Sequence, residues 1–184
     1  MPIAIALLRG INVGGKNSLP MEHLRKLCEN AGLDEVRTYI QSGNVVFSAP
    51  SREIAAAASK IEDAIEADRG FRPSVVIRTR DELAAAIRAN PFAARAKAEP
   101  AKLLVMFLKS KPGVGASDAL EGVKRSDEQL RLIGRELFID FPGGIGRSKL
   151  AIAAVEKALG VPATSRNWNT VLKLLAMADE LEVS

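Results

Sequence analysis

Residues 3–17, IAIALLRGINVGGKN, join an apolar run to a glycine-rich loop and indicate how the chain is organised. Residues 3–8 are apolar at every position, so both faces of this predicted strand should be buried, as in the centre of a sheet. The loop at residues 9–17 carries three glycines, two asparagines and two cations. A loop of this kind after a buried strand can bring backbone N–H groups and positive charge close to an anion.

Working outward from this segment, the pattern predicts a ferredoxin-like first half. Ser18 is a suitable N-cap and Pro20 suits a first helical turn, so a helix should run from there to Gly32. Strands at 36–40 and 44–48, a helix at 52–68, a strand at 74–78 and a short helix at 81–89 should follow. The resulting βαββαβ order is the split βαβ arrangement.

The second half repeats the strand–helix–hairpin pattern and predicts a smaller α+β subdomain ending in two helices. Its expected elements are a strand at 102–109, a weak helix at 117–124, a hairpin of strands at 128–133 and 137–141, and helices at 148–159 and 164–182. Residues 90–100, rich in alanine and bounded by prolines, form the best boundary. We therefore predict an α+β protein with subdomains at residues 1–90 and 100–184.

Composition excludes several classes of protein. The 184 residues include 26 cations and 22 anions, a balance that permits an anionic partner without a basic tail. One cysteine and one histidine rule out a disulfide framework or a Cys/His zinc cluster. Cys28 falls on the apolar side of its helix and is expected to be a buried structural thiol, whereas His23 is expected to be solvated. With no signal peptide and no membrane-spanning run, we expect a cytoplasmic protein.

The loop at 9–17 allows two interpretations. Gly10 to Lys16 fits the G-x-x-x-x-G-K spacing of phosphate-binding loops. A true P-loop is disfavoured because Asn17 replaces the Mg²⁺-binding Ser/Thr, the helix starts late, and the predicted sheet is antiparallel. The open alternatives are a loop that binds an anion through Arg9, Lys16 and backbone N–H groups, or glycines that only make a tight connection.

Polar residues gather at three further places. The hairpin TYIQSGNVVF, residues 38–47, presents Gln41, Ser42 and Asn44 at its tip, where turn residues are expected in any case. Its aromatics only weakly suggest an RNA-binding sheet. Behind the glycine-rich stretch PGGIG, residues 142–146, the cations Arg147 and Lys149 should open a helix with Ser148, and a helix start can bind an anion. Asp140, at the preceding strand end, is the best-placed carboxylate.

The C-terminal stretch TSRNWNTVLKLL, residues 164–175, is expected to be helical. In that conformation Trp168, Val171, Leu172 and Leu175 form one apolar stripe, with Trp168 as a core anchor. Polar side chains then align on another face, either as solvated groups or as one wall of a site. This polar set comprises Arg166, Asn169, Thr170 and Lys173.

Four blocks of this sequence, RGINVGGKN, TYIQSGNVVF, GRSKL and TSRNWNTVLKL, closely resemble a bacterial family named domain of unknown function 1697 (DUF1697). The resemblance extends from about residue 3 to residue 178. It implies a two-part α+β fold, one part ferredoxin-like. It implies no activity and transfers no catalytic residue to this chain.

We expect the polar loops of the two halves to form one site for a small anionic ligand, such as a nucleotide or a phosphorylated metabolite, with or without an enzymatic step. The alternatives are a nucleic-acid-binding module, which is less favoured, and a protein in which the blocks are purely structural. No pattern points to a catalytic residue, a metal, a particular cofactor, a membrane or an oligomeric state. The predicted ligand-binding residues are Arg9, Asn12, Lys16, Asn44, Arg147, Lys149, Arg166, Asn169 and Lys173.

Overall fold

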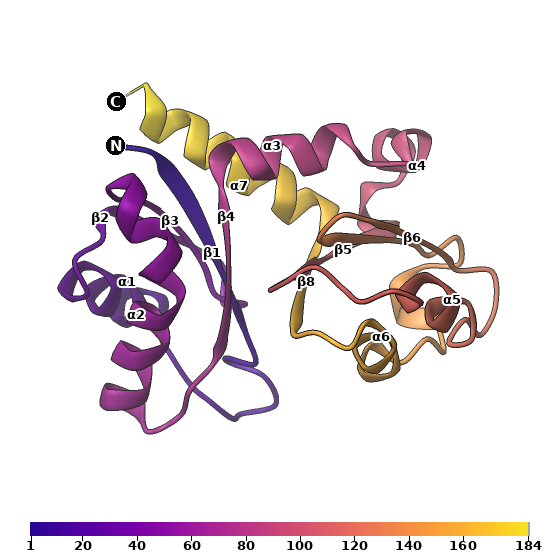
Figure 1. Cartoon of the computed structure of the whole chain (residues 1–184), viewed down its shortest axis with the longest axis horizontal. Coiled ribbons are helices and arrows are strands. Elements are labelled where there is room, and N and C mark those ends of the chain that lie inside the picture. The colour runs from indigo at the N-terminus through magenta and orange to yellow at the C-terminus, as the bar shows by residue number, and fades with distance from the viewer. Residues whose placement is uncertain (184) are drawn as a thin grey trace. The chain divides into compact units, whose positions relative to one another are not determined.

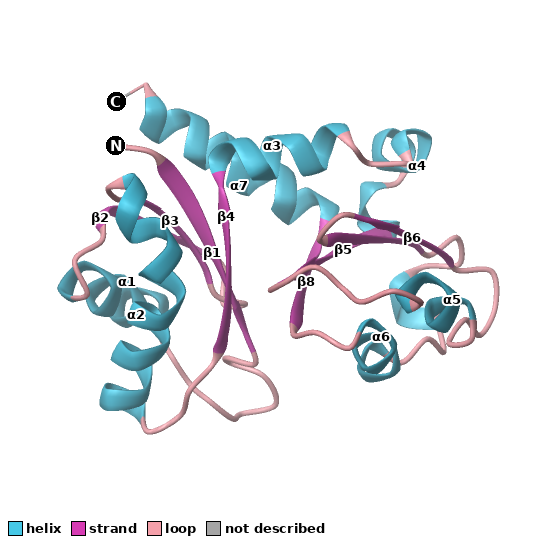
Figure 2. Cartoon of the chain, in the orientation of Figure 1, coloured by secondary structure: helices cyan, strands magenta, loops and turns pink. Residues whose placement is uncertain are grey.

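The computed structural model describes residues 1–183 and divides into two compact units. The first comprises Met1–Ala84 together with the chain from Lys173 onward, and the second comprises Ala85–Leu172. Each unit contains one four-stranded antiparallel sheet, so the predicted α+β class is confirmed (Figures 1 and 2). The predicted domain limits, 1–90 and 100–184, stay a prediction.

The first unit has the predicted βαββαβ order. Its elements are β1 (Ile3–Arg9), α1 (Met21–Asn30), β2 (Asp34–Tyr39), β3 (Asn44–Ser48), α2 (Ser51–Arg69) and β4 (Ser74–Thr79). The strand order β2-β3-β1-β4 places β1 in the interior of the sheet, as its uninterrupted apolar sequence predicts. Figure 1 shows α1 and α2 together on one face of this sheet.

The core of the first unit lies between that sheet face and the two helices. Alternate β1 residues Ala4, Ala6 and Leu8 are buried there because successive side chains of a strand point to opposite faces. Cys28 of α1 belongs to the same core, and its burial raises the pKa of the thiol to about 12. It is thus the buried structural thiol expected from the sequence. His23 lies toward the surface, where it pairs with Asp68 at 2.6 Å.

The second unit repeats this architecture. Its elements are α4 (Ala93–Ala98), η1 (Pro100–Lys102), β5 (Leu103–Leu108), α5 (Ala116–Glu121), β6 (Gln129–Ile133), β7 (Glu136–Asp140), η2 (Ile145–Arg147), α6 (Ile152–Leu159) and β8 (Ala163–Asn167). The order β6-β7-β5-β8 is equivalent to that of the first sheet. The helices α5 and α6 cover one face (Figure 1), and the core there includes Leu104, Met106, Leu120 and Val155.

Two helices connect the units. The helix α3 (Arg80–Arg88) follows β4, and α7 (Trp168–Glu182) follows β8. The C-terminal part of α7 is tied to the start of α3 by an ion pair between Arg80 and Asp179 at 2.7 Å. Among residues 1–183, no helix is both long and apolar enough to span a bilayer.

The sequence-based prediction was wrong about where the last two helices begin. Residues 163–167 form the strand β8, so α7 starts at Trp168 instead of Thr164. Likewise α6 starts at Ile152, and Ser148 precedes it. The two C-terminal helices exist, with a strand between them. The strand was missed because two of its buried side chains, Thr164 and Arg166, are polar, which hides the apolar alternation that identifies a half-buried strand.

The apolar face of α7 also differs from the predicted one. Trp168 is 4% exposed and Val171 is 1% exposed, so both are core residues as predicted. Leu172, however, is 42% exposed, and Leu174 takes its place in the core at 1% exposure. The buried apolar residues at the start of α7 are therefore Trp168, Val171 and Leu174, at i, i+3, i+6 spacing.

A cationic pocket as the candidate functional site

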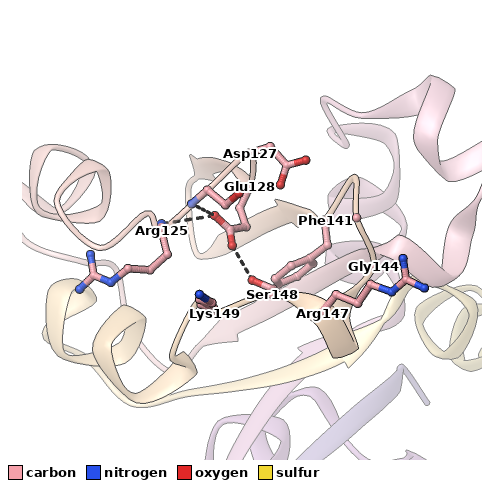
Figure 3. Close-up of a pocket in the computed structure, with 10 residues that line it drawn as sticks. Arg125, Asp127, Glu128, Phe141, Gly144, Arg147, Ser148 and Lys149 are labelled. Carbon is pink, nitrogen blue, oxygen red and sulfur yellow. Dashed lines mark hydrogen bonds between the residues drawn. The ribbon is translucent and has the colours of Figure 1, made fainter.

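The candidate site is a pocket of about 370 Å³ in the second unit. Three segments line it: the residues just before β6, the loop after β7, and the residues just before α6 (Figure 3). Two of the predicted ligand-binding residues, Arg147 and Lys149, are among them. The full lining comprises Arg125, Ser126, Asp127, Glu128, Phe141, Gly143, Gly144, Arg147, Ser148 and Lys149.

Glu128 is the structural centre of this pocket. Its side chain is buried, at 2% exposure. Its carboxylate accepts hydrogen bonds from the backbone N–H groups of Arg125 (3.3 Å) and Ser126 (2.8 Å) and from the Ser148 hydroxyl (Figure 3). These donors, Ser148 first, hold the pKa of Glu128 below its ordinary value, so the group is ionised at neutral pH. Glu128 thereby fastens two walls of the pocket to each other.

Ser148 has a second role in the same wall. Its oxygen accepts a hydrogen bond from the backbone N–H of Leu150 at 3.0 Å while its hydroxyl donates to Glu128. The residues on either side of it, Arg147 and Lys149, are therefore held in a fixed backbone segment. This segment precedes α6, so Arg147 and Lys149 do not open that helix as the sequence had predicted.

The cations of the pocket are available to a ligand. Within residues 1–183, neither Arg147 nor Lys149 forms an ion pair or a side-chain hydrogen bond, and both are exposed. In the described part of the chain, the Arg125 guanidinium donates only to the backbone carbonyls of Gly122 and Lys124. Over the same residues, the backbone N–H groups of Gly143 and Lys149 donate to no protein acceptor.

The charges that line the pocket sum to a small positive value. Three cations face two carboxylates, Asp127 and Glu128. The Glu128 charge is spread over three internal donors, whereas Asp127 is exposed at the rim. The cationic side chains thus keep unused donors that can bind an anion of compact shape.

Two predicted residues of the first unit have structural roles. The Asn12 amide donates to the carbonyls of Leu19 and Gln41, each at 2.9 Å, and its oxygen accepts from Leu19 N–H at 2.7 Å. Asn44, fully buried, donates to the Tyr39 carbonyl at 2.8 Å. Both side chains therefore hold the turn at residues 39–44 and the loop after β1 in place.

The remaining predicted residues are spread over both units. Arg9 is exposed at the end of β1, Lys16 is exposed on the loop that follows, and Lys173 is exposed on α7. In the second unit, Arg166 of β8 is 5% exposed and its Nη1 donates to the Thr164 hydroxyl (2.9 Å) and the Ser165 carbonyl (2.7 Å). Burial lowers the pKa of Arg166 to about 10.

Asn169 is exposed at the first turn of α7, where its backbone N–H donates to Asn167 Oδ1 at 3.0 Å. The nine predicted residues thus comprise five in the first unit and four in the second, and the pocket brings together Arg147 and Lys149. The single site predicted to combine both units stays a prediction.

Glu128 was not predicted as a site residue. Its partners are backbone N–H groups and a serine twenty residues away, and such contacts leave no periodic pattern. The pairing of Ser126 with a glutamate two residues later was the one local hint, because short acid–backbone turns use such spacing. Within residues 1–183, no group of three His, Cys, Asp or Glu side chains could hold a metal ion.

Comparisons with known proteins agree with the resemblance drawn from the sequence. The family model described as "Protein of unknown function (DUF1697)" matches residues 1–138. The blocks at 146–150 and 164–174 lie beyond that match. No match was found among curated proteins. A solved structure, that of the conserved bacterial protein SP0830 from Streptococcus pneumoniae, is similar with a TM-score of 0.73 and 28% identity, covering 96% of this chain and 98% of that one.

Proposed function

We propose that this chain, which belongs to the DUF1697 family, binds a small anionic ligand, a nucleotide or a phosphorylated metabolite, in the pocket around Glu128. One observation carries the proposal. Arg147 and Lys149 have no charged partner within residues 1–183, while the adjacent buried acid is satisfied by other donors. The Glu128 carboxylate already has its own hydrogen-bond donors, and neither cation is held in an internal ion pair. An anion can therefore bind to the two cations without first breaking an ion pair.

The size and chemistry of the pocket support a phosphate-bearing ligand. A volume of about 370 Å³ lies within the range of small-molecule sites, roughly 300–1,000 Å³. Lys149 offers a point charge and Arg147 a planar fork, the two cation types that bind phosphate in proteins. The N–H of Gly143 adds a neutral donor without a side chain in the way.

The test is calorimetric titration of the full chain with inorganic phosphate, pyrophosphate, adenosine triphosphate and glucose 6-phosphate. Adenosine and glucose serve as uncharged counterparts. We expect at least one phosphate compound to bind and its uncharged counterpart to bind far more weakly. Arg147→Gln and Lys149→Gln should each weaken this binding about tenfold or more, as loss of a charge-assisted hydrogen bond implies.

The matched control is Lys97→Gln, an exposed cation on α4 that does not line the pocket. It should leave the affinity unchanged. Absence of binding by every phosphate compound, or equal weakening by Lys97→Gln, would refute the proposal. A short oligonucleotide is titrated in the same way at two salt concentrations. If it alone binds, with affinity falling steeply as salt rises, the result supports the nucleic-acid alternative instead.

A further inference from the structure

A second pocket, of about 400 Å³, lies in the second unit between α4 and the end of β7. It is lined by Pro91, Phe92, three alanines of α4, Arg95 and Asp140, and shares no lining residue with the cationic pocket. Asp140 and Phe141 are consecutive and project to opposite faces of the sheet, so each belongs to a different pocket. The two pockets are therefore separate sites of one unit.

The polar residues of this pocket, Arg95 and Asp140, form an ion pair that leaves one donor and one acceptor without a hydrogen bond. Arg95 Nε donates to Asp140 Oδ1 at 2.7 Å, with the two side chains 21% and 7% exposed. The Nη1 group of Arg95 donates to Glu99. Within residues 1–183, no hydrogen bond is made by Arg95 Nη2 or by Asp140 Oδ2. A donor and an acceptor on paired side chains are thus left for a ligand.

Neither of these two atoms is sealed inside the protein. Among the described residues, the one side-chain polar atom that is both buried and without a partner is the hydroxyl of Ser48. Arg95 Nη2 and Asp140 Oδ2 must therefore reach solvent, and both of their residues line the pocket. Both residues that carry these atoms therefore border the space that a ligand would occupy.

The wall of the pocket supplies a flat apolar surface. Phe92 is half-buried and lines the pocket beside Pro91. Its backbone is fixed, because its N–H donates to Asn90 Oδ1 at 2.9 Å and its carbonyl accepts from Ala96 N–H at 2.9 Å. Its ring then has only two side-chain torsions to order, so it can stack on a flat ligand at a small cost in conformational entropy.

We propose that this pocket binds a flat ring whose edge carries an N–H next to a C=O. The N–H would donate to Asp140 Oδ2, the C=O would accept from Arg95 Nη2, and the ring would stack on Phe92. Guanine and uracil carry this pair at the ring edge, and nicotinamide carries it in the carboxamide attached to its ring. The inference is independent of the anion-binding proposal, because it uses other residues and needs no phosphate.

The experiment is calorimetric titration of the full chain with guanosine, uridine and nicotinamide. Each is paired with an analogue whose N–H is blocked: 1-methylguanosine, 3-methyluridine and N,N-dimethylnicotinamide. We expect at least one parent compound to bind with a dissociation constant of about a millimolar or lower. The dissociation constant of its blocked analogue should be higher by about tenfold or more. Which parent binds tells purine, pyrimidine and pyridine rings apart.

Two variants tie the binding to the pocket. Phe92→Leu removes the aromatic face and Arg95→Lys keeps the charge next to Asp140 but removes the forked donor. Both should weaken binding of the parent compound by about tenfold, with circular dichroism confirming that they fold. Lys97→Ala, on the same helix but outside the pocket, should not. The inference is overturned if no parent compound binds, if blocked and parent compounds bind equally, or if the pocket variants bind as the wild type does.

Discussion

The Ser148 hydroxyl donates a hydrogen bond to the buried carboxylate of Glu128, twenty residues earlier in the chain. The same carboxylate accepts hydrogen bonds from the backbone N–H groups of Arg125 and Ser126. One side chain therefore joins the segment before β6 to the segment before α6. Since these segments carry the three cations of the pocket, the spacing of those cations depends on this one contact.

The first prediction concerns this contact. Glu128→Gln and Ser148→Ala should each lower the free energy of unfolding by about 1–3 kcal/mol, because each leaves buried polar partners unsatisfied. They should also weaken phosphate binding. The double variant should lose less than the sum, with a coupling energy of about 0.5–3 kcal/mol, as for residues in one network. Urea unfolding and calorimetry measure the two effects.

Asp127→Asn is the matched control, because Asp127 lines the same pocket but is exposed. It should change the free energy of unfolding by less than about 0.5 kcal/mol. Strictly additive losses in Glu128→Gln and Ser148→Ala would show that the two residues act separately.

The second prediction is a dependence of stability on pH. The pKa of Glu128 lies below its ordinary value in the folded protein, and the unfolded chain lacks the donors that lower it. Its contribution to stability is therefore complete above pH 4.5, the ordinary value, and is lost as pH falls through the folded pKa. The difference in unfolding free energy between wild type and Glu128→Gln should be constant near neutral pH and shrink in acid. A gap that widened in acid would contradict this assignment.

Much of the fold could be predicted because apolar patterns report burial directly. Residues 3–8 are apolar throughout, and β1 is indeed an interior strand buried on both faces. The strand β8 could not be recognised in the same way. Its buried residues Thr164 and Arg166 are polar, so the strand does not show the apolar alternation by which a half-buried strand is recognised.

Of the residues that line the candidate site, only two exposed cations could be predicted from the sequence. Arg147 and Lys149 follow a glycine-rich loop, which marks them in the sequence. The role of Glu128 depends on backbone N–H groups whose direction is set by the turn before β6. Asn12 is the opposite case. Its amide looked available to a ligand in the sequence, whereas the folded loop uses both its donor and its acceptor.

The third prediction distinguishes scaffold from site at Arg166. Because its guanidinium is buried and bonded to Thr164 and Ser165, Arg166→Ala should lower the free energy of unfolding by at least about 1–3 kcal/mol. Arg147→Ala, an exposed and unpaired cation within residues 1–183, should change it by less than about 0.5 kcal/mol. Urea titration of both variants decides. Equal, small effects would return Arg166 to the group of ligand-binding candidates.

The fourth prediction concerns the turn that the β1 loop packs against. Gly43 has φ +85°, and a Cβ there would lie 2.6 Å from Ile11 Cδ1 and 2.9 Å from Leu8 Cβ. Gly43→Ala therefore combines left-handed backbone strain of about 1–2 kcal/mol with overpacking of about 1–3 kcal/mol. Gly14→Ala is the matched comparison, since Gly14 also has positive φ, at +57°, but no atom within 4 Å of its Cβ position.

Gly14→Ala should thus lower the free energy of unfolding only by the backbone strain. The difference between the two variants in urea unfolding then measures the cost of overpacking the turn against Leu8 and Ile11. The Gly43 carbonyl also accepts a hydrogen bond from the backbone N–H of Leu8 at 2.8 Å. The turn therefore cannot move to make room for the added methyl group without weakening that bond to β1. Equal losses in the two variants would mean that the loop moves aside freely. In that case the motif blocks at 9–17 and 38–47 would not be coupled through the fold.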